Sequence, residues 1–266
     1  MKTRIISGII MGAIVAAVLV LGFLISSVFI TLAVGLLAAG AVYELLHNAV
    51  GIKDKATVIG AAVFAVLCVF TGEFGIQWIS GLFTVCVLYC IYAVVMILKN
   101  HKDFDLAKIC AVYGLPIAFS IAFFCLNRII IVGNGIYYLL LLLNFSSVCD
   151  MGAYFVGVTC GKHKLCPNIS PKKTVEGAIG GIVSSIVFSV IISLIFGKFS
   201  VLLLLMTIPF CVLGMIGDLF ASAIKRSVDL KDYGNLIPGH GGIMDRLDSI
   251  IMIAPLMFIS IGFNLI

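Results

Sequence analysis

Long apolar runs separated by short polar segments make up most of this sequence. A helix needs about 20 mostly apolar residues to cross the hydrocarbon core of a bilayer. The pattern predicts about nine such spans, at residues 5–23, 25–46, 57–71, 76–98, 106–126, 129–149, 175–196, 200–224 and 249–265. We therefore expect an all-α, polytopic integral membrane protein.

The polar motifs are unevenly distributed over these spans. The first half offers apolar runs and little else, whereas the long polar loops lie in the second half. This predicts an N-terminal transmembrane region at residues 1–126 and a C-terminal transmembrane region at residues 127–266 that carries the chemistry. The boundary follows the division near Arg128 between the fifth and sixth runs.

The basic residues lie almost entirely on one side of the predicted spans. With the N-terminus placed in the cytoplasm, all of the 17 lysines and arginines except Arg128 and Lys198 fall on the cytoplasmic side. Cytoplasmic loops of membrane proteins carry the lysine and arginine excess. A miscounted span would spoil this segregation, so the charges predict a cytoplasmic N-terminus.

Composition excludes a water-soluble domain. The chain is 62% hydrophobic and 11% charged, with a mean hydropathy of +1.26, whereas soluble domains carry about 25% charged residues. The net charge of +5 follows from the basic loops, so it does not indicate nucleic acid binding. Most of the cysteines lie inside apolar runs, where a free thiol behaves as a small hydrophobic group.

Three carboxylates interrupt or border the apolar runs. Asp150 ends the sixth predicted span, Glu176 begins the seventh, and Asp218 lies about two turns before the end of the eighth. Ionisable groups at such positions are costly and suggest a function. Structural hydrogen bonds between helices are the alternative. All three approach the predicted cytoplasmic face, which favours a site there.

The loop before the seventh span is strongly basic. Ser170 is a plausible helix N-cap and Pro171 a first helical residue. Lys172 and Lys173 beside a helix N-terminus would make an anion site, although a basic cytoplasmic loop without a ligand is the alternative. Glu176 can serve capping or a metal.

The same loop contains three soft metal ligands, Cys160, His163 and Cys166. Structural zinc sites usually bring four ligands in paired spacings. No second pair follows in the sequence, so a structural metal is not favoured.

The loop after the eighth span contains the densest polar pattern. Ser222, Lys225 and Arg226 fall within one turn of each other on a continuing helix. The segment 238–242, with His240 between glycines, allows the backbone to approach a ligand closely. Asp245 and Asp248 are spaced so that both can face one side of the last helix.

Carboxylates of this kind suit a hard cation. Mg²⁺ completes its coordination with water and phosphate oxygens, and lysines and arginines can hold the remaining phosphate oxygens. A solvated, salt-bridged loop is the alternative, but it explains Asp248 better than the more deeply placed Asp218. The residues alone predict an interfacial site for a phosphate-rich, metal-bound ligand.

These positions resemble the phosphatidate cytidylyltransferase (CDP-diacylglycerol synthase) family. The resemblance rests on Ser222, Lys225, Arg226, Lys231, Asp232, Gly234, Pro238, His240, Gly241, Gly242, Asp245, Arg246 and Asp248 in the register of its signature. The segments 170–174 and 150–155 are also similar. The first half of the chain resembles the family only as a hydrophobic, multi-span region.

The resemblance implies a reaction and its setting. CTP and phosphatidate would give CDP-diacylglycerol and pyrophosphate, with Mg²⁺ required and a second cation left open. It also implies a homodimer in the bacterial inner membrane, with an active site on the cytoplasmic face and no nucleic acid partner.

The resemblance also implies the roles of particular residues. It implies that the metal is bound by Asp218, Asp245 and Asp248. It implies that the catalytic residues are Asp218, Asp245, Lys225, Arg226 and His240. It implies that substrate is bound by Ser170, Lys172, Lys173, Ser222, Lys231 and Arg246.

Two other classes of protein fit the sequence less well. A CDP-alcohol phosphatidyltransferase would carry an Asp-Gly-x-x-Ala-Arg opening followed by spaced aspartates, which this chain lacks. An ion-coupled transporter would place ionisable residues near the bilayer midplane in both halves. Here they gather at one predicted face and in one half.

Overall fold

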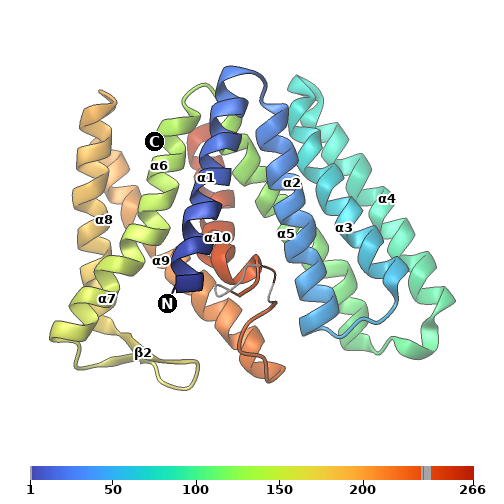
Figure 1. Ribbon diagram of the computed structural model, residues 1–266. Helices are drawn as coiled ribbons and strands as arrows, with labels where there is room; N and C mark the ends of the chain where they lie inside the picture. Colours follow the sequence, from blue (N-terminus) through green and yellow to red (C-terminus); the bar gives the residue numbers. More distant parts are fainter. Residues whose placement is uncertain (1, 235, 237–240) are drawn as a thin grey trace. The chain divides into compact units, whose positions relative to one another are not determined.

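The computed structural model describes residues 2–234, 236 and 241–266 (Figure 1). Apart from one small β-hairpin, its regular structure is helical, as the sequence predicts. The chain forms two compact units. Unit 1 comprises Met1–Ile131 and Val228–Arg246, and unit 2 comprises Val132–Ser227 and Leu247–Ile266. The boundary predicted after residue 126 lies inside a helix, and part of the C-terminal half groups with unit 1.

Unit 1 contains five long helices and the loop after the eighth span. The helices α2, α3 and α5 pack against one another, which is visible in Figure 1. The elements are α1 (Lys2–Leu24), α2 (Val28–Tyr43), the π-helix η1 (Glu44–Ala49), α3 (Lys55–Phe70), the 3₁₀ turns η2 (Thr71–Glu73) and η3 (Gly75–Gln77), α4 (Trp78–Lys99), the 3₁₀ turn η4 (His101–Asp103) and α5 (Leu106–Ile131).

Small residues allow these helices to pack closely. Ala38 and Ala41 on α2, and Ala61 and Ala65 on α3, are fully buried. Helices in a bilayer associate through close packing and interhelical hydrogen bonds, because lipid tails are as apolar as leucine. The buried Asn127 amide of α5 accordingly donates to the Thr31 hydroxyl of α2 over 3.0 Å.

Unit 2 contains the hairpin and the remaining helices. Its elements are α6 (Gly135–Leu143), the π-helix η5 (Asn144–Val148), α7 (Cys149–Cys160), β1 (Lys164–Cys166), β2 (Ser170–Thr174), α8 (Val175–Ile195) and α9 (Val201–Ser227), together with most of α10 (Met244–Gly262). The hairpin lies beyond the end of α7 and the start of α8 (Figure 1).

A stripe of small residues on α8 brings α7 against it. Every fourth position along this face is buried and small, and the stripe consists of Gly177, Gly181, Ser185, Ser189 and Ser193. A Cβ atom at Gly181 would lie 2.6 Å from the Cys149 carbonyl oxygen. Only glycine therefore allows the two backbones to approach this closely.

Two predicted span boundaries are wrong. The fifth helix continues past Arg128 to Ile131, and Arg128 donates to the Gly72 carbonyl over 2.8 Å, so the charge has a partner inside unit 1. The sixth helical segment continues from Gly135 to Cys160, beyond the predicted end at residue 149. Asp150 therefore lies within a helix, because the following apolar side chains extend the segment.

Eight helices in the described part of the chain are long and apolar enough to cross a membrane. They correspond to the first eight predicted spans. The ninth predicted span corresponds to α10, whose first turns carry Asp245, Arg246 and Asp248. The protein is therefore a multi-pass membrane protein, as predicted.

Candidate active site

The basic loop before α8 is a β-hairpin. Strands β1 and β2 pair antiparallel, with Lys164 opposite Thr174 and Cys166 opposite Ser170. The prediction of a helix start at Ser170 is wrong, because Ser170 precedes a proline and such residues favour extended backbone. The helix begins at Val175, and the Thr174 hydroxyl caps it by accepting from Gly177 N over 3.1 Å.

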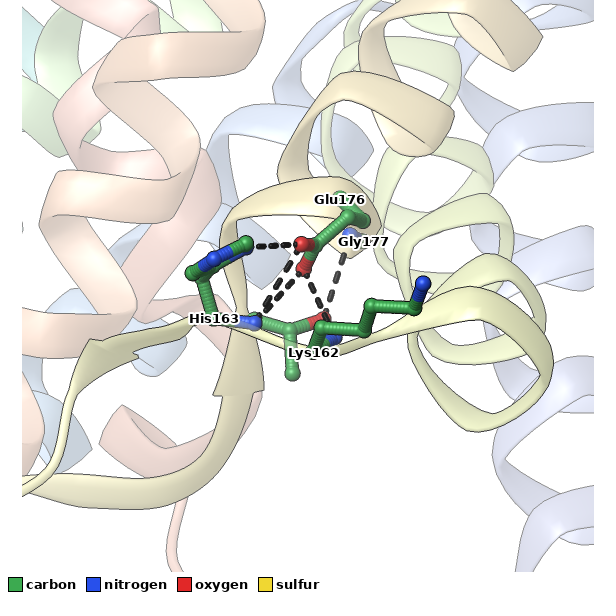
Figure 2. Close-up of polar contacts among 5 residues, drawn as sticks. Lys162, His163, Glu176 and Gly177 are labelled. Atoms are coloured by element: carbon green, nitrogen blue, oxygen red, sulfur yellow. Dashed lines mark hydrogen bonds and ion pairs between the residues drawn. The ribbon is translucent and has the colours of Figure 1, made fainter.

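Glu176, in the first turn of α8, anchors this hairpin. Figure 2 shows its carboxylate directed at the chain just before β1. The carboxylate accepts hydrogen bonds from Lys162 N and His163 N, both at 3.1 Å to Oε2, and Oε1 lies 2.6 Å from His163 Nδ1. Glu176 thus supports the loop through both of its carboxylate oxygens.

A cavity of about 580 Å³ lies between the hairpin and α7, α8 and α9. Its lining divides by chemistry. The charged residues of the lining are Asp150, Lys164, Lys172, Lys173 and Asp218, and its larger apolar residues are Tyr154, Val158, Leu165 and Met215. A ligand with a phosphate at one end and an apolar body matches such a lining.

Asp218 is a cavity carboxylate that has both an ion-pair partner and a hydrogen-bond donor. Lys173 Nζ lies 2.6 Å from its Oδ2 atom, and Ser222 Oγ donates to Oδ1 over 3.4 Å. Ser222 is one helical turn further along α9, and Lys225 and Arg226 follow in its last turn. The hairpin and α9 therefore bring together Lys173 and Asp218, which are 45 positions apart in the sequence.

Asp248 lies at the crossing of α9 and α10. A Cβ atom at Gly217 would lie 2.7 Å from the Asp248 carbonyl oxygen, so the missing side chain lets the two backbones meet. Asp218 directly follows this glycine. Asp218 and Asp248, the two predicted metal ligands in unit 2, therefore both lie where α9 and α10 cross.

Asp245 belongs to unit 1, where it stabilises the loop before α10. Its Oδ2 atom accepts from Tyr233 N over 2.8 Å and from Gly242 N over 3.0 Å. Lys231 and Arg246, predicted to bind substrate, are exposed in the same unit. His240 was predicted to line the site and lies outside the described residues.

Glu44 is a buried carboxylate that was not among the predicted site residues. This carboxylate is only 3% exposed, and it accepts from Ile243 N over 3.1 Å and from Met244 N over 3.0 Å. Glu44 interrupts an apolar run, as Asp218 does, and this position in the sequence could have marked it as a functional candidate. Its partners are 199 and 200 residues away in sequence, so no local pattern could identify them.

The structure groups only some of the predicted residues. Lys172, Lys173 and Asp218 line one cavity, and Ser222 contacts Asp218. Ser170 is in β2 but not in the cavity lining. Within the described ranges, no three acidic, histidine or cysteine side chains are placed to hold a metal ion together. Mg²⁺ usually needs one or two carboxylates and completes its shell with substrate phosphates, so the donor chemistry at Asp218 and Asp248 fits this ion.

Comparison with known proteins identifies the family. The Cytidylyltransferase family matches residues 2–263. Phosphatidate cytidylyltransferases of Staphylococcus haemolyticus (strain JCSC1435) and Staphylococcus aureus (strain COL) are 32% identical over 264 and 263 residues, covering 97% of each chain. That of Bacillus subtilis (strain 168) is 46% identical over 111 residues, 41% of each chain. The chain therefore belongs to the cytidylyltransferase family.

Proposed function

We propose that this protein is a nucleotidyltransferase that transfers the CMP group of CTP to phosphatidate, giving CDP-diacylglycerol and pyrophosphate. The observation that carries the proposal is the mixed lining of the unit 2 cavity, which combines basic and apolar side chains. Lys172 and Lys173 supply positive charge for phosphate, while Tyr154, Val158 and Met215 supply an apolar wall for the lipid. The relatives named above carry this activity in their names.

The reaction needs little acid–base chemistry. An oxygen of the phosphatidate phosphate attacks the α-phosphorus of CTP, the bond from that phosphorus to the bridging oxygen breaks, and pyrophosphate leaves with the electron pair. The nucleophile is already an anion, so the main obstacle is the approach of two anions. Positioning and electrostatic stabilisation supply most catalysis of this type.

The lysines of the hairpin are suited to that task. Lys173 is half-buried and paired with Asp218, whereas Lys172 is exposed. A phosphate entering the cavity offers Lys173 a second anionic partner. Lys225 and Arg226, at the end of the helix that carries Asp218, add positive charge for the triphosphate.

We assign a magnesium ion to the carboxylates at the crossing of α9 and α10. Asp218 and Asp248 would hold it, and Asp245 is assigned by the resemblance alone. A bound Mg²⁺ would neutralise charge on the phosphates and on the departing pyrophosphate. The ion pair between Lys173 and Asp218 holds the ammonium and the carboxylate next to each other in the cavity.

The basic loops and the bacterial relatives support a proposal for the setting of the enzyme. We place the active site on the cytoplasmic face of a bacterial plasma membrane, because CTP is cytoplasmic and the basic loops predict this side. A homodimer remains part of the proposal from family resemblance.

A reconstituted assay tests the activity. Purified protein in detergent is given labelled CTP, phosphatidate and Mg²⁺, and the lipid phase is analysed for CDP-diacylglycerol. Diacylglycerol, which lacks the phosphate nucleophile, replaces phosphatidate in the control. Labelled lipid is expected only with phosphatidate. A protein that instead releases CMP from CDP-diacylglycerol when given an alcohol, or forms no lipid-linked CMP, would contradict the proposal.

A further inference from the structure

Glu44 lies where the second span ends, in the π-helical turn η1. Both of its carboxylate oxygens accept backbone hydrogen bonds from the segment that begins α10. Oε1 accepts from Ile243 N over 3.1 Å, and Oε2 accepts from Met244 N over 3.0 Å. Hydrogen bonds to an ionised carboxylate are the strong ones, and a negative charge at a helix N-terminus is further stabilised by the helix dipole.

Asn48, one turn further along η1, holds the other end of the same loop. Its Nδ2 atom donates to the Tyr233 carbonyl over 2.6 Å. The amide of Tyr233 in turn donates to Asp245 Oδ2, which also accepts from Gly242 N. Glu44 and Asn48 therefore hydrogen-bond to the two loop segments whose amides donate to the Asp245 carboxylate.

Two glycines of this loop, Gly234 and Gly242, lie directly against the Glu44 carboxylate. A Cβ atom at Gly234 would lie 2.6 Å from Glu44 Oε1, and one at Gly242 would collide with Oε2. The sequence suggested that the segment 238–242 allows the backbone to approach a ligand closely. In unit 1, Gly242 of this segment, like Gly234 before it, lies close to a buried carboxylate of the second span.

We propose that Glu44, assisted by Asn48, is a positioning residue that sets the place of Asp245 at the start of α10. The inference rests on the proposed function, in which Asp245 serves metal binding and catalysis. It gives the N-terminal half of the chain a role in the reaction beyond anchoring. Glu44 itself touches no reacting atom and acts only through the loop.

The test compares Glu44→Gln with Glu73→Gln. Both changes replace a carboxylate of unit 1 with an amide, but Glu73 accepts from the side chains of Ser27 and Thr31 and not from this loop. Hydrogen exchange of peptides covering residues 230–246 and CMP transfer at varied Mg²⁺ are measured on full-length protein in detergent.

Glu44→Gln is expected to speed exchange at Gly242, Ile243 and Met244. It should also lower kcat by about 10-fold or more and raise the Mg²⁺ needed for half activity, because a displaced loop misplaces Asp245. The KM for CTP should change less than kcat does. Glu73→Gln should leave the loop exchange and the Mg²⁺ requirement within about twofold of the parent.

Gly242→Ala provides a second route if Glu44→Gln does not fold. It should produce the same loop and Mg²⁺ phenotype by pushing the new methyl group into the carboxylate. Combining it with Glu44→Ala, which removes the obstacle, should be no worse than Glu44→Ala alone.

Wild-type loop exchange and kinetics in Glu44→Gln, or equal effects in Glu73→Gln, would overturn the inference. Inactivity of the parent protein would refute the proposed function separately. The exchange data would still decide whether Glu44 holds the loop.

Discussion

Lys173 Nζ lies 2.6 Å from Asp218 Oδ2, and both residues line the same cavity of unit 2. The ammonium is supplied by strand β2 and the carboxylate by helix α9. Because each group is only about one quarter exposed, the pair is partly shielded from water. Loss of one partner leaves the other charge without compensation.

Lys173→Gln should reduce CMP transfer by roughly 10- to 100-fold, because one charge-assisted hydrogen bond is worth about 1.5–3 kcal/mol. Steady-state kinetics with phosphatidate and CTP varied in turn measure the loss. Lys162→Gln is the matched control, since Lys162 is exposed just before the hairpin and does not line the cavity. Equal rates for the two variants would remove Lys173 from the site.

Asp218→Asn and Asp248→Asn should each lower activity by about 100-fold or more, because each removes one negative charge from the proposed magnesium site. The double variant should be little worse than either single, since residues that act as a unit are non-additive. Raising Mg²⁺ should restore part of the activity if binding of the ion is weakened. Near-parental activity and Mg²⁺ dependence in Asp218→Asn would show that Asp218 is a structural partner of Lys173 only.

Glu176→Ala should loosen the hairpin. The change removes the acceptor of the Lys162 and His163 amides, so these amides should exchange faster and the KM for phosphatidate should rise by several-fold. His163→Ala removes only the exposed ring contact. Exposed ion pairs contribute about 0–1 kcal/mol, so this control should change KM by less than about fivefold. A larger effect from His163→Ala would mean that the ring, and not the backbone, positions the hairpin.

Single cysteines introduced beside Lys53, Lys99, Lys172 and Lys231 should resist a membrane-impermeant maleimide in intact cells, whereas one beside Lys198 should react. The asymmetry of the basic residues predicts that the first four positions lie inside. Exposed native cysteines, Cys110 and Cys160, are replaced beforehand, and permeabilised cells show that every site can react. Labelling beside Lys231 from outside would place the signature loop away from CTP.

The spans could be predicted because each depends on a local property. An apolar run of sufficient length must be helical in a bilayer, since its backbone groups have no water to bind. This is why the first eight runs and the start of the last helix near Asp245 were identified. The places where they end were less predictable, and Asp150 lies inside a helix because apolar residues continue after it.

The candidate site was predictable in part. The spacing of Ser222, Lys225 and Arg226 places them on one helix end, and a helix is what the structure contains. The segment at Ser170 was predicted as a helix start, but pairing with the strand at Lys164 overrides that local signal. Strand pairing depends on a second segment, so one segment's sequence does not reveal it.

The sequence by itself determined that this is a multi-pass membrane protein with a basic, carboxylate-bearing signature loop, because hydrophobicity, charge and helical spacing are read along the chain. Only the tertiary structure decided the partners of the buried charges. Lys173 meets Asp218, and Glu44 meets the amides of Ile243 and Met244. A charge in an apolar setting must be paired, but which group pairs with it depends on which helices and strands pack together.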